Sequence, residues 1–360
     1  MTSTGDGRNI DPSSGILEGE ASEQAVPADR ATSEGGAPYD VWRGAGTGPA
    51  PPTYYDRPVL KEPVWIWAVP AYFYAGGTAG GAAVLGAAAQ LVDRHELDGL
   101  IRRSRWIAAA GTAAGTALLI VDLGKPGRFL NMLRVFRATS PLSVGSWILA
   151  PATVLAAASA ALPGAAGDAA GLAAGALGAP LSGYTAVLLN NTAIPVWQAP
   201  RRALPPLFVA SAAAGAASLL DLLDLSDREH RLVWHFGVAA KAADLLAATA
   251  VEKEASAVDR VGRALKEGLG GALWRTAKLC TAASLAASLV PVGSRRVRRR
   301  VSGALGTAGA IALRFALWHA GKTSSADPRA TFEMQRAGHG AADVTGIPAV
   351  TGPGGRRALS

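Results

Sequence analysis

Long apolar segments alternate with short polar ones over most of the chain. Eight of these segments are built mainly from Ala, Gly, Leu and Val, and each is about as long as a helix must be to cross a bilayer core ~30 Å thick. The many small residues favour close packing between helices in lipid. The pattern therefore predicts an all-α integral membrane protein, folded as an eight-transmembrane-helix bundle. The predicted spans are 64–92, 106–123, 142–162, 169–191, 204–223, 232–251, 274–290 and 301–320.

The two ends of the chain lack this pattern. Residues 1–60 are rich in Gly, Pro, Ser and acidic side chains and show no apolar periodicity, which is typical of a disordered segment. We therefore expect a disordered polar N-terminal tail at 1–60 and an eight-helix membrane domain at 61–322. A polar C-terminal tail at 323–360 is expected to lie on the membrane surface or to be disordered.

Eight spans place both termini on one side of the membrane, which we name side A; the opposite side is side B. The number of Lys and Arg residues in the short loops does not distinguish the two sides, so the positive-inside rule gives no answer from the count alone. The arginines of side B are tightly clustered, most of all at 295–300. This clustering favours side B as cytoplasmic and the termini as extracytoplasmic, in a multi-pass protein of the cell membrane.

The composition of the chain limits the kinds of cofactor and partner that we expect it to bind. Charged residues make up only 17% of the chain, and the net charge is +8. Because the basic residues lie between apolar segments, we expect them to contact membrane lipid headgroups and not nucleic acid. Cys280 is the single cysteine, so the chain has no Cys-ligated metal site or iron–sulfur cluster of its own. A bis-histidine haem is disfavoured because His235 and His319, the only histidines near membrane depth, are expected at opposite ends of the bundle.

Polar residues of several predicted spans converge on side A. A polar side chain at membrane depth is costly and is therefore a candidate for function. Alternating helix directions bring these residues to the same leaflet and predict one polar pocket there, although each could instead cap a helix or reach for headgroups. The residues are Tyr72, Asp122, Lys125, Arg128, Asn131, Ser143, Ser146, Tyr184, Asn190, Asn191, Lys278 and Arg314.

A second polar group lies nearer side B. Lys241 and Asp244 are three residues apart in one predicted span, so they share a helix face and could form a buried pair. Asp221 and Asp224 lie at the side B end of the preceding span. The group is either structural or part of a proton path toward side B, formed by Lys241, Asp244 and Asp221.

Several sequence strings carry a family resemblance. Two runs resemble hallmark segments of the NrfD/polysulfide reductase (PsrC-like) membrane-subunit family. They extend from Asp122 to Met132 (DLGKPGRFLNM) and from Ser140 to Trp147 (SPLSVGSW). The stretch from Tyr184 to Trp197 (YTAVLLNNTAIPVW) is similar to the family's fourth helix. The entry from Val59 to Trp65 (VLKEPVW), together with Arg314 and the tail from Ala320 to Pro328 (AGKTSSADP), fits as well, so the resemblance covers roughly 57–336.

The resemblance implies a membrane anchor and quinone-reactive subunit of a respiratory oxidoreductase, not catalytic on its own. It implies electron exchange between menaquinone, or another quinone, and a ferredoxin-like four-cluster iron–sulfur subunit, beside a molybdopterin catalytic subunit. Asp122 would exchange protons, and Lys125 or Arg128 would stabilise negative charge. The quinone-binding candidates are Tyr72, Ser143, Tyr184, Asn190 and Arg314.

Two other functions remain open at this stage. Lys241, Asp244 and Asp221 could couple ion movement in a secondary transporter, although we find no internal repeat of the kind common in transporters. A purely structural membrane anchor with a degenerate pocket is the other alternative.

Overall fold

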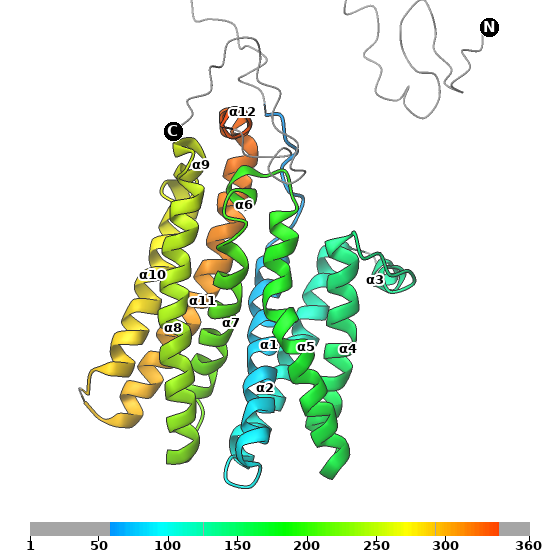
Figure 1. Cartoon of the computed structure of the whole chain (residues 1–360), viewed down its shortest axis with the longest axis vertical. Helices are drawn as coiled ribbons and strands as arrows, with labels where there is room; N and C mark the ends of the chain where they lie inside the picture. The colour runs from blue at the N-terminus through cyan, green and yellow to red at the C-terminus, as the bar shows by residue number, and fades with distance from the viewer. Residues whose placement is uncertain (1–57, 125, 292, 338–360) are drawn as a thin grey trace, which may run out of the picture. The chain divides into compact units, whose positions relative to one another are not determined.

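The computed structural model describes residues 58–124, 126–291 and 293–337, and within these ranges the chain is helical and contains no strand (Figure 1). Side-chain caps mark the start of four helices of the described chain: α4, α8, α11 and α12. Ser140 caps α4 with Pro141 in its first turn, and Ser226 forms a capping box with Glu229 at the start of α8. The helices are α1 Ala68–Asp93, α2 Asp98–Leu123, α3 Pro126–Met132, α4 Pro141–Ala161, α5 Gly164–Asn190, α6 Pro195–Gln198, α7 Leu204–Asp221, α8 Asp227–Ala255, α9 Asp259–Arg263, α10 Gly268–Leu289, α11 Arg295–Ala326 and α12 Pro328–Arg336.

Each of the eight predicted apolar segments overlaps one long helix of the described chain. Six of these helices, α1, α2, α4, α5, α7 and α11, are long and apolar enough to cross a membrane. α8 and α10 are long but carry charged residues within their length, which lowers their mean hydropathy. The all-α membrane fold is therefore confirmed. Of the eight predicted spans, six are supported by the length and apolar character of their helices.

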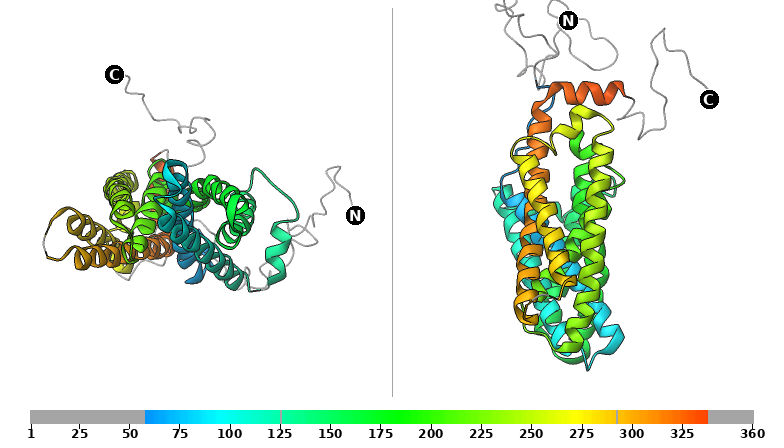
Figure 2. Two further views of the ribbon diagram at one scale, coloured as in Figure 1. Left: turned by 90° about the horizontal axis from the view of Figure 1, so that it is seen from below. Right: turned by 90° about the vertical axis from the view of Figure 1, so that its left-hand side faces the viewer.

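The long helices form two groups of four. α1, α2, α4 and α5 pack on one another and are named the first bundle; α7, α8, α10 and α11 are named the second bundle. The two bundles meet mainly where α1 packs on α7 and α11 and where α5 packs on α7 (Figures 1 and 2).

Small residues allow the helix backbones to touch at these crossings. A Cβ atom added to Gly80 would lie 2.5 Å from the Gly178 carbonyl oxygen, so α1 and α5 are in backbone contact there. A Cβ atom added to Gly81 would lie 2.8 Å from the Ala212 carbonyl oxygen, where α1 meets α7. This is the close packing that glycine and alanine permit in lipid.

The short helices lie at the side A end of the long ones. α12 runs across that end (Figure 2), and its capping residue Asp327 accepts a hydrogen bond from Arg260 Nε of α9 at 2.6 Å. This carboxylate raises the pKa of Arg260 above its ordinary value. The first part of the predicted C-terminal tail, through Arg336, is therefore helical. The predicted N-terminal tail, apart from its last three residues, and the stretch 338–360 lie outside the described residues.

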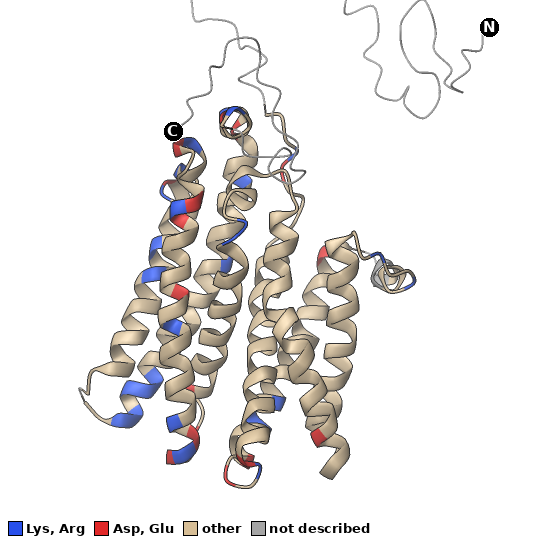
Figure 3. Cartoon of the chain, in the orientation of Figure 1, with Lys and Arg blue, Asp and Glu red and all other residues tan. Residues whose placement is uncertain are grey.

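Charged side chains gather toward the two ends of the helices, and a few lie at mid-height on α8 and α11 (Figure 3). The charged ends and apolar middles fit a bundle that spans a membrane.

Candidate functional site

Two tyrosines meet between α1 and α5 in the first bundle. The hydroxyl groups of Tyr72 and Tyr184 are hydrogen-bonded to each other, across 112 residues of sequence. Tyr72 is buried, whereas Tyr184 remains partly exposed at the bundle surface. The pair therefore offers phenolic groups that can donate and accept hydrogen bonds.

Glycines form the surface against which the two rings lie. Gly145 of α4 faces the Tyr184 ring so closely that an added Cβ would overlap it. Gly115 of α2 faces Tyr72, and an added Cβ there would lie 3.2 Å from the ring. The glycine of the SPLSVGSW string is thus the residue that lets the Tyr184 ring pack against α4.

The tyrosine pair lies one to two helical turns from the side A ends of α1 and α5. Tyr72 is the fifth residue of α1, and Tyr184 comes six residues before the end of α5, so both lie roughly 6–9 Å inside their helices at 1.5 Å per residue. Asp122 lies higher, near the end of α2, where its Oδ1 accepts a hydrogen bond from the Ile66 backbone N–H at 3.0 Å. A carboxylate at the surface and two phenols beneath it thus occupy the same end of the first bundle.

The remaining first-bundle candidates have local roles in the structure. The Ser143 hydroxyl accepts a hydrogen bond from the Arg137 N–H at 3.0 Å and donates one to the Val135 carbonyl at 3.3 Å. Asn190 Nδ2 donates to the Arg201 carbonyl at 3.1 Å, and its buried Oδ1 has no hydrogen-bond partner within the described ranges. Lys125 and the side chain of Arg128 lie outside the described part of the chain.

Arg314 lies where the two bundles meet. Its side chain is 2% exposed, lies 3.8 Å above the centre of the Phe208 ring and donates to the Phe208 carbonyl at 3.1 Å. It also attracts the Asp244 carboxylate on α8. Tyr72 bonds to Tyr184 of α5, whereas Arg314 bonds to α7 and also reaches α1, where a Cβ atom added to Gly77 would lie 3.6 Å from its Nη2. Arg314 therefore stands where the two bundles meet, between one and two helical turns along α1 from Tyr72.

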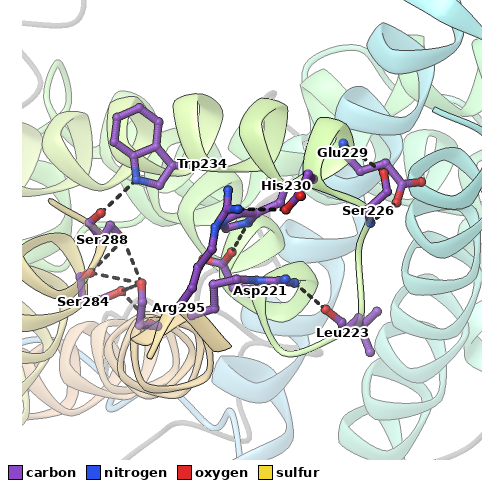
Figure 4. Close-up of polar contacts among 12 residues, drawn as sticks. Asp221, Leu223, Ser226, Glu229, His230, Trp234, Ser284, Ser288 and Arg295 are labelled. Atoms are coloured by element: carbon purple, nitrogen blue, oxygen red, sulfur yellow. Dashed lines mark hydrogen bonds and ion pairs between the residues drawn. The ribbon is translucent and has the colours of Figure 1, made fainter. Parts of the chain in front are cut away.

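The ion pairs of the predicted group near side B also differ from those expected from the sequence. Lys241 Nζ lies 3.9 Å from Asp221 Oδ2 and donates to the Ser302 hydroxyl at 2.8 Å, so its carboxylate neighbour is on α7 and not one turn along α8. Figure 4 shows Asp221 facing His230 beside Ser284 and Ser288. Within the described residues Lys241 pairs with Asp221, whereas the Asp244 carboxylate is attracted by Arg314, so the possible Lys241–Asp244 ion pair is not formed there.

Sequence reasoning missed the aromatic residues that join the bundles. Trp65 stacks on Trp197 with ring centroids 5.4 Å apart, and the Trp197 indole N–H donates to the Leu317 carbonyl at 2.7 Å. Gly321 lies so close to the Trp197 ring that no side chain fits there. The signal was present, because Trp65, Trp197 and Gly321 all belong to the strings that carry the resemblance.

The match to a known family covers all eight long helices except the last residues of α11. Residues 58–323 match the family described as polysulphide reductase, NrfD. No curated protein matches the chain. The matched range runs from the segment before α1 into the last turn of α11 and includes both bundles. The chain is therefore a multi-pass membrane protein of the NrfD family, and this family implies a membrane subunit of a polysulfide-reductase-like complex.

Proposed function

We propose that this chain is the quinone-reactive subunit of a respiratory oxidoreductase complex. It exchanges electrons between menaquinone, or another quinone, and an iron–sulfur partner that docks on side A. The observation that carries the proposal is the hydrogen-bonded Tyr72–Tyr184 pair beneath Asp122, at one end of a chain of the NrfD family.

The residues at this end suit a quinone headgroup. A quinone supplies two-electron chemistry when bound, and its two oxygens need hydrogen-bond donors and a source or acceptor of protons. Tyr184 donates a hydrogen bond to a headgroup oxygen from the lipid-exposed side, and Tyr72 holds the Tyr184 hydroxyl in place. Asp122, close to water, exchanges protons with the side A surface. Lys125 and Arg128, which follow Asp122, favour negative charge at the headgroup.

In this proposal, electrons pass between the quinone and a partner subunit that carries the metal clusters. Among the described residues, no group of three His, Cys, Asp or Glu side chains is placed to hold a metal ion. We infer a ferredoxin-like four-cluster subunit and a molybdopterin subunit from the family, with the eight long helices as their anchor. In this proposal side A faces outward, α8 and α10 also cross the membrane, and Ser143 and Asn190 shape the loops around the headgroup.

Conservative substitutions in the intact complex test the proposal. Tyr184→Phe and Tyr72→Phe should each lower quinol-linked electron transfer at least tenfold, because each removes a phenolic O–H from the hydrogen-bonded pair. Tyr74→Phe is the matched control: Tyr74 lies two residues from Tyr72, about 200° around α1, and its hydroxyl faces Thr78 and Thr307 and not the Tyr72–Tyr184 pair. Electron transfer from an artificial donor to the iron–sulfur partner should be unchanged in all three variants.

Full quinol-linked turnover in both Tyr72→Phe and Tyr184→Phe would overturn the site. A transporter remains the second candidate function because the second bundle buries Lys241, Asp244 and Asp221. Solute uptake by the purified chain alone in liposomes would favour that alternative, whereas co-purification with an iron–sulfur protein would favour the proposal.

A further inference from the structure

The second bundle holds a cluster of buried ionisable side chains near side B. Asp221, His230 and Lys241 are 6%, 6% and 1% exposed. Asp221 lies between the other two: its Oδ1 is 3.7 Å from His230 Nδ1, and its Oδ2 is 3.9 Å from Lys241 Nζ. Three helix segments, the end of α7 and two parts of α8, thus bring an acid between two bases.

A set of serines holds the lysine amine from the opposite side. Lys241 Nζ donates to the hydroxyls of Ser302 at 2.8 Å and Ser288 at 3.3 Å. These two hydroxyls lie 2.8 Å apart, and Ser302 also bonds with Ser284. The indole of Trp234 donates to the Ser288 carbonyl at 2.9 Å (Figure 4). The amine is therefore surrounded by groups that both donate and accept hydrogen bonds.

The contact between Asp221 and His230 is too long for a direct hydrogen bond. Asp221 Oδ1 and His230 Nδ1 have no hydrogen-bond partner among the described residues, although both side chains are more than nine-tenths buried. A cavity of about 10 Å³ touches Asp221, His230, Ser288 and Ser302. This volume is about the minimum that admits one water, and a polar contact of this length is typically bridged by one.

The cluster borders the side B surface. Arg298 and Arg299 line the same cavity, and Arg299 donates to the Leu223 carbonyl at 2.7 Å. Arg295, which pairs with the exposed Asp227 at 2.8 Å, also faces His230. The His230 ring thus stands between the arginine-rich start of α11 and the buried Asp221.

The polar track continues inward by one helical turn. Asp244 follows Lys241 on α8 by three residues, is 5% exposed and attracts Arg314. Beyond Arg314 the interior is apolar: Phe208 lies under the guanidinium, and Phe73, Trp197 and Leu317 belong to the same packed core. Arg314 also reaches α1, the helix that carries Tyr72, because a Cβ atom added to Gly77 would lie 3.6 Å from its Nη2. The track therefore approaches side B and ends inside the protein against the bundle that carries the tyrosine pair.

We propose that the second bundle contains a proton half-channel that joins side B to the Arg314–Asp244 pair. A proton taken up by His230 passes, through a bridging water, to the Asp221 carboxylate. Lys241 gives its own proton inward, through a second water, to Asp244 one turn along α8, and it is then reprotonated by Asp221, so each transfer conserves charge and atoms. The protons are those consumed or released by quinone chemistry, and in this respect the inference rests on the proposed function.

The first experiment asks whether the track admits water from side B, and it needs no quinone. In a Cys280→Ser background, Ser302→Cys is exposed to silver ions in sealed vesicles of either orientation, and free thiols are then counted after denaturation. Silver added on side B should block Ser302→Cys at least tenfold faster than silver added on side A. Ala316→Cys on the same helix, which is 0% exposed and lies in the apolar core, should react from neither side. Equal rates for Ser302→Cys and Ala316→Cys would overturn the half-channel.

The second experiment measures proton movement in the intact complex reconstituted in liposomes. With a pH dye on side B, Asp221→Asn and Lys241→Met should lower the proton change per quinone converted at least tenfold. Asp224→Asn, an exposed carboxylate three residues from Asp221, should leave this ratio unchanged. Tyr184→Phe should slow turnover and keep the ratio, which separates failure of the quinone site from failure of the channel. Unchanged ratios in Asp221→Asn and Lys241→Met would overturn the inference while the proposed function stands.

Discussion

The first bundle packs through glycine, alanine and hydroxyl side chains, whereas the second bundle buries charged and histidine residues. Within the described chain, every Asp, Glu, Lys, Arg or His that is fully buried lies on α7, α8 or α11: Asp221, Glu229, His230, Lys241, Asp244 and Arg314. The first bundle has its tyrosine pair close to side A, and all four of its helices are apolar enough to span a membrane. We infer that the first bundle holds a lipid-soluble ligand through a neutral tyrosine pair, with charged groups only at its side A end, and that the second bundle handles protons through buried charged groups.

The largest expected effect comes from breaking the deepest charged pair. Arg314→Met leaves Asp244 without its opposite charge inside the second bundle, and removing one partner of a buried pair costs about 3 kcal/mol or somewhat more. The free energy of unfolding in mixed micelles, followed by helical circular dichroism, should fall accordingly.

A double mutant tests whether the loss of stability in Arg314→Met comes from the unpaired charge of Asp244. Asp244→Asn alone should also destabilise the protein, but Arg314→Met combined with Asp244→Asn should recover about 1 kcal/mol or more relative to the sum of the single changes. Additive losses would mean that Arg314 acts only through packing on Phe208, and the contrast between the bundles would weaken.

In the first bundle, we expect an added methyl group to destabilise the protein, as the loss of a buried charge does in the second bundle. Gly145→Ala places a methyl group against the Tyr184 ring, and such overpacking typically costs about 1–3 kcal/mol. Because the ring must move away from Tyr72, quinol-linked turnover should fall at least tenfold. Gly115→Ala should be milder, because its methyl would lie 3.2 Å from the Tyr72 ring. Equal turnover of Gly145→Ala and the unaltered complex would contradict the role of the pair.

The sequence predicts the helices well because segment length and apolar content are local properties. It predicts the depth of Tyr72, Tyr184 and Arg314 for the same reason, since helix direction alternates. It does not predict rotation about the helix axis, so residues at side A depth were assigned to one pocket although Arg314 bonds to Phe208 of α7 and not to the tyrosine pair. The pairing of Lys241 with Asp221 rests on the packing of α7 against α8, which spacing along one helix cannot show.

A smaller effect is expected where the two bundles are joined. Trp197→Phe keeps most of the stacking on Trp65 and removes the indole N–H that bonds the Leu317 carbonyl, which contributes about 1 kcal/mol. The midpoint of thermal unfolding should fall by a few degrees. Quinol turnover and proton movement should change together, because this contact belongs to neither site. A selective loss of one activity would assign Trp197 to that site.

The smallest effect should come from Asp224→Asn, and its comparison with Asp221→Asn isolates burial as the cause. Asp224 pairs with Arg296 at 3.1 Å, but the two side chains are 76% and 68% exposed. Water and salt screen such pairs, so the free energy of unfolding should change by less than about 0.5 kcal/mol, and less still at high salt. Asp221 is the same residue type three positions earlier on the chain, buried between Lys241 and His230. If Asp224→Asn impaired proton movement as much as Asp221→Asn does, the surface arginines and not the buried cluster would control access from side B.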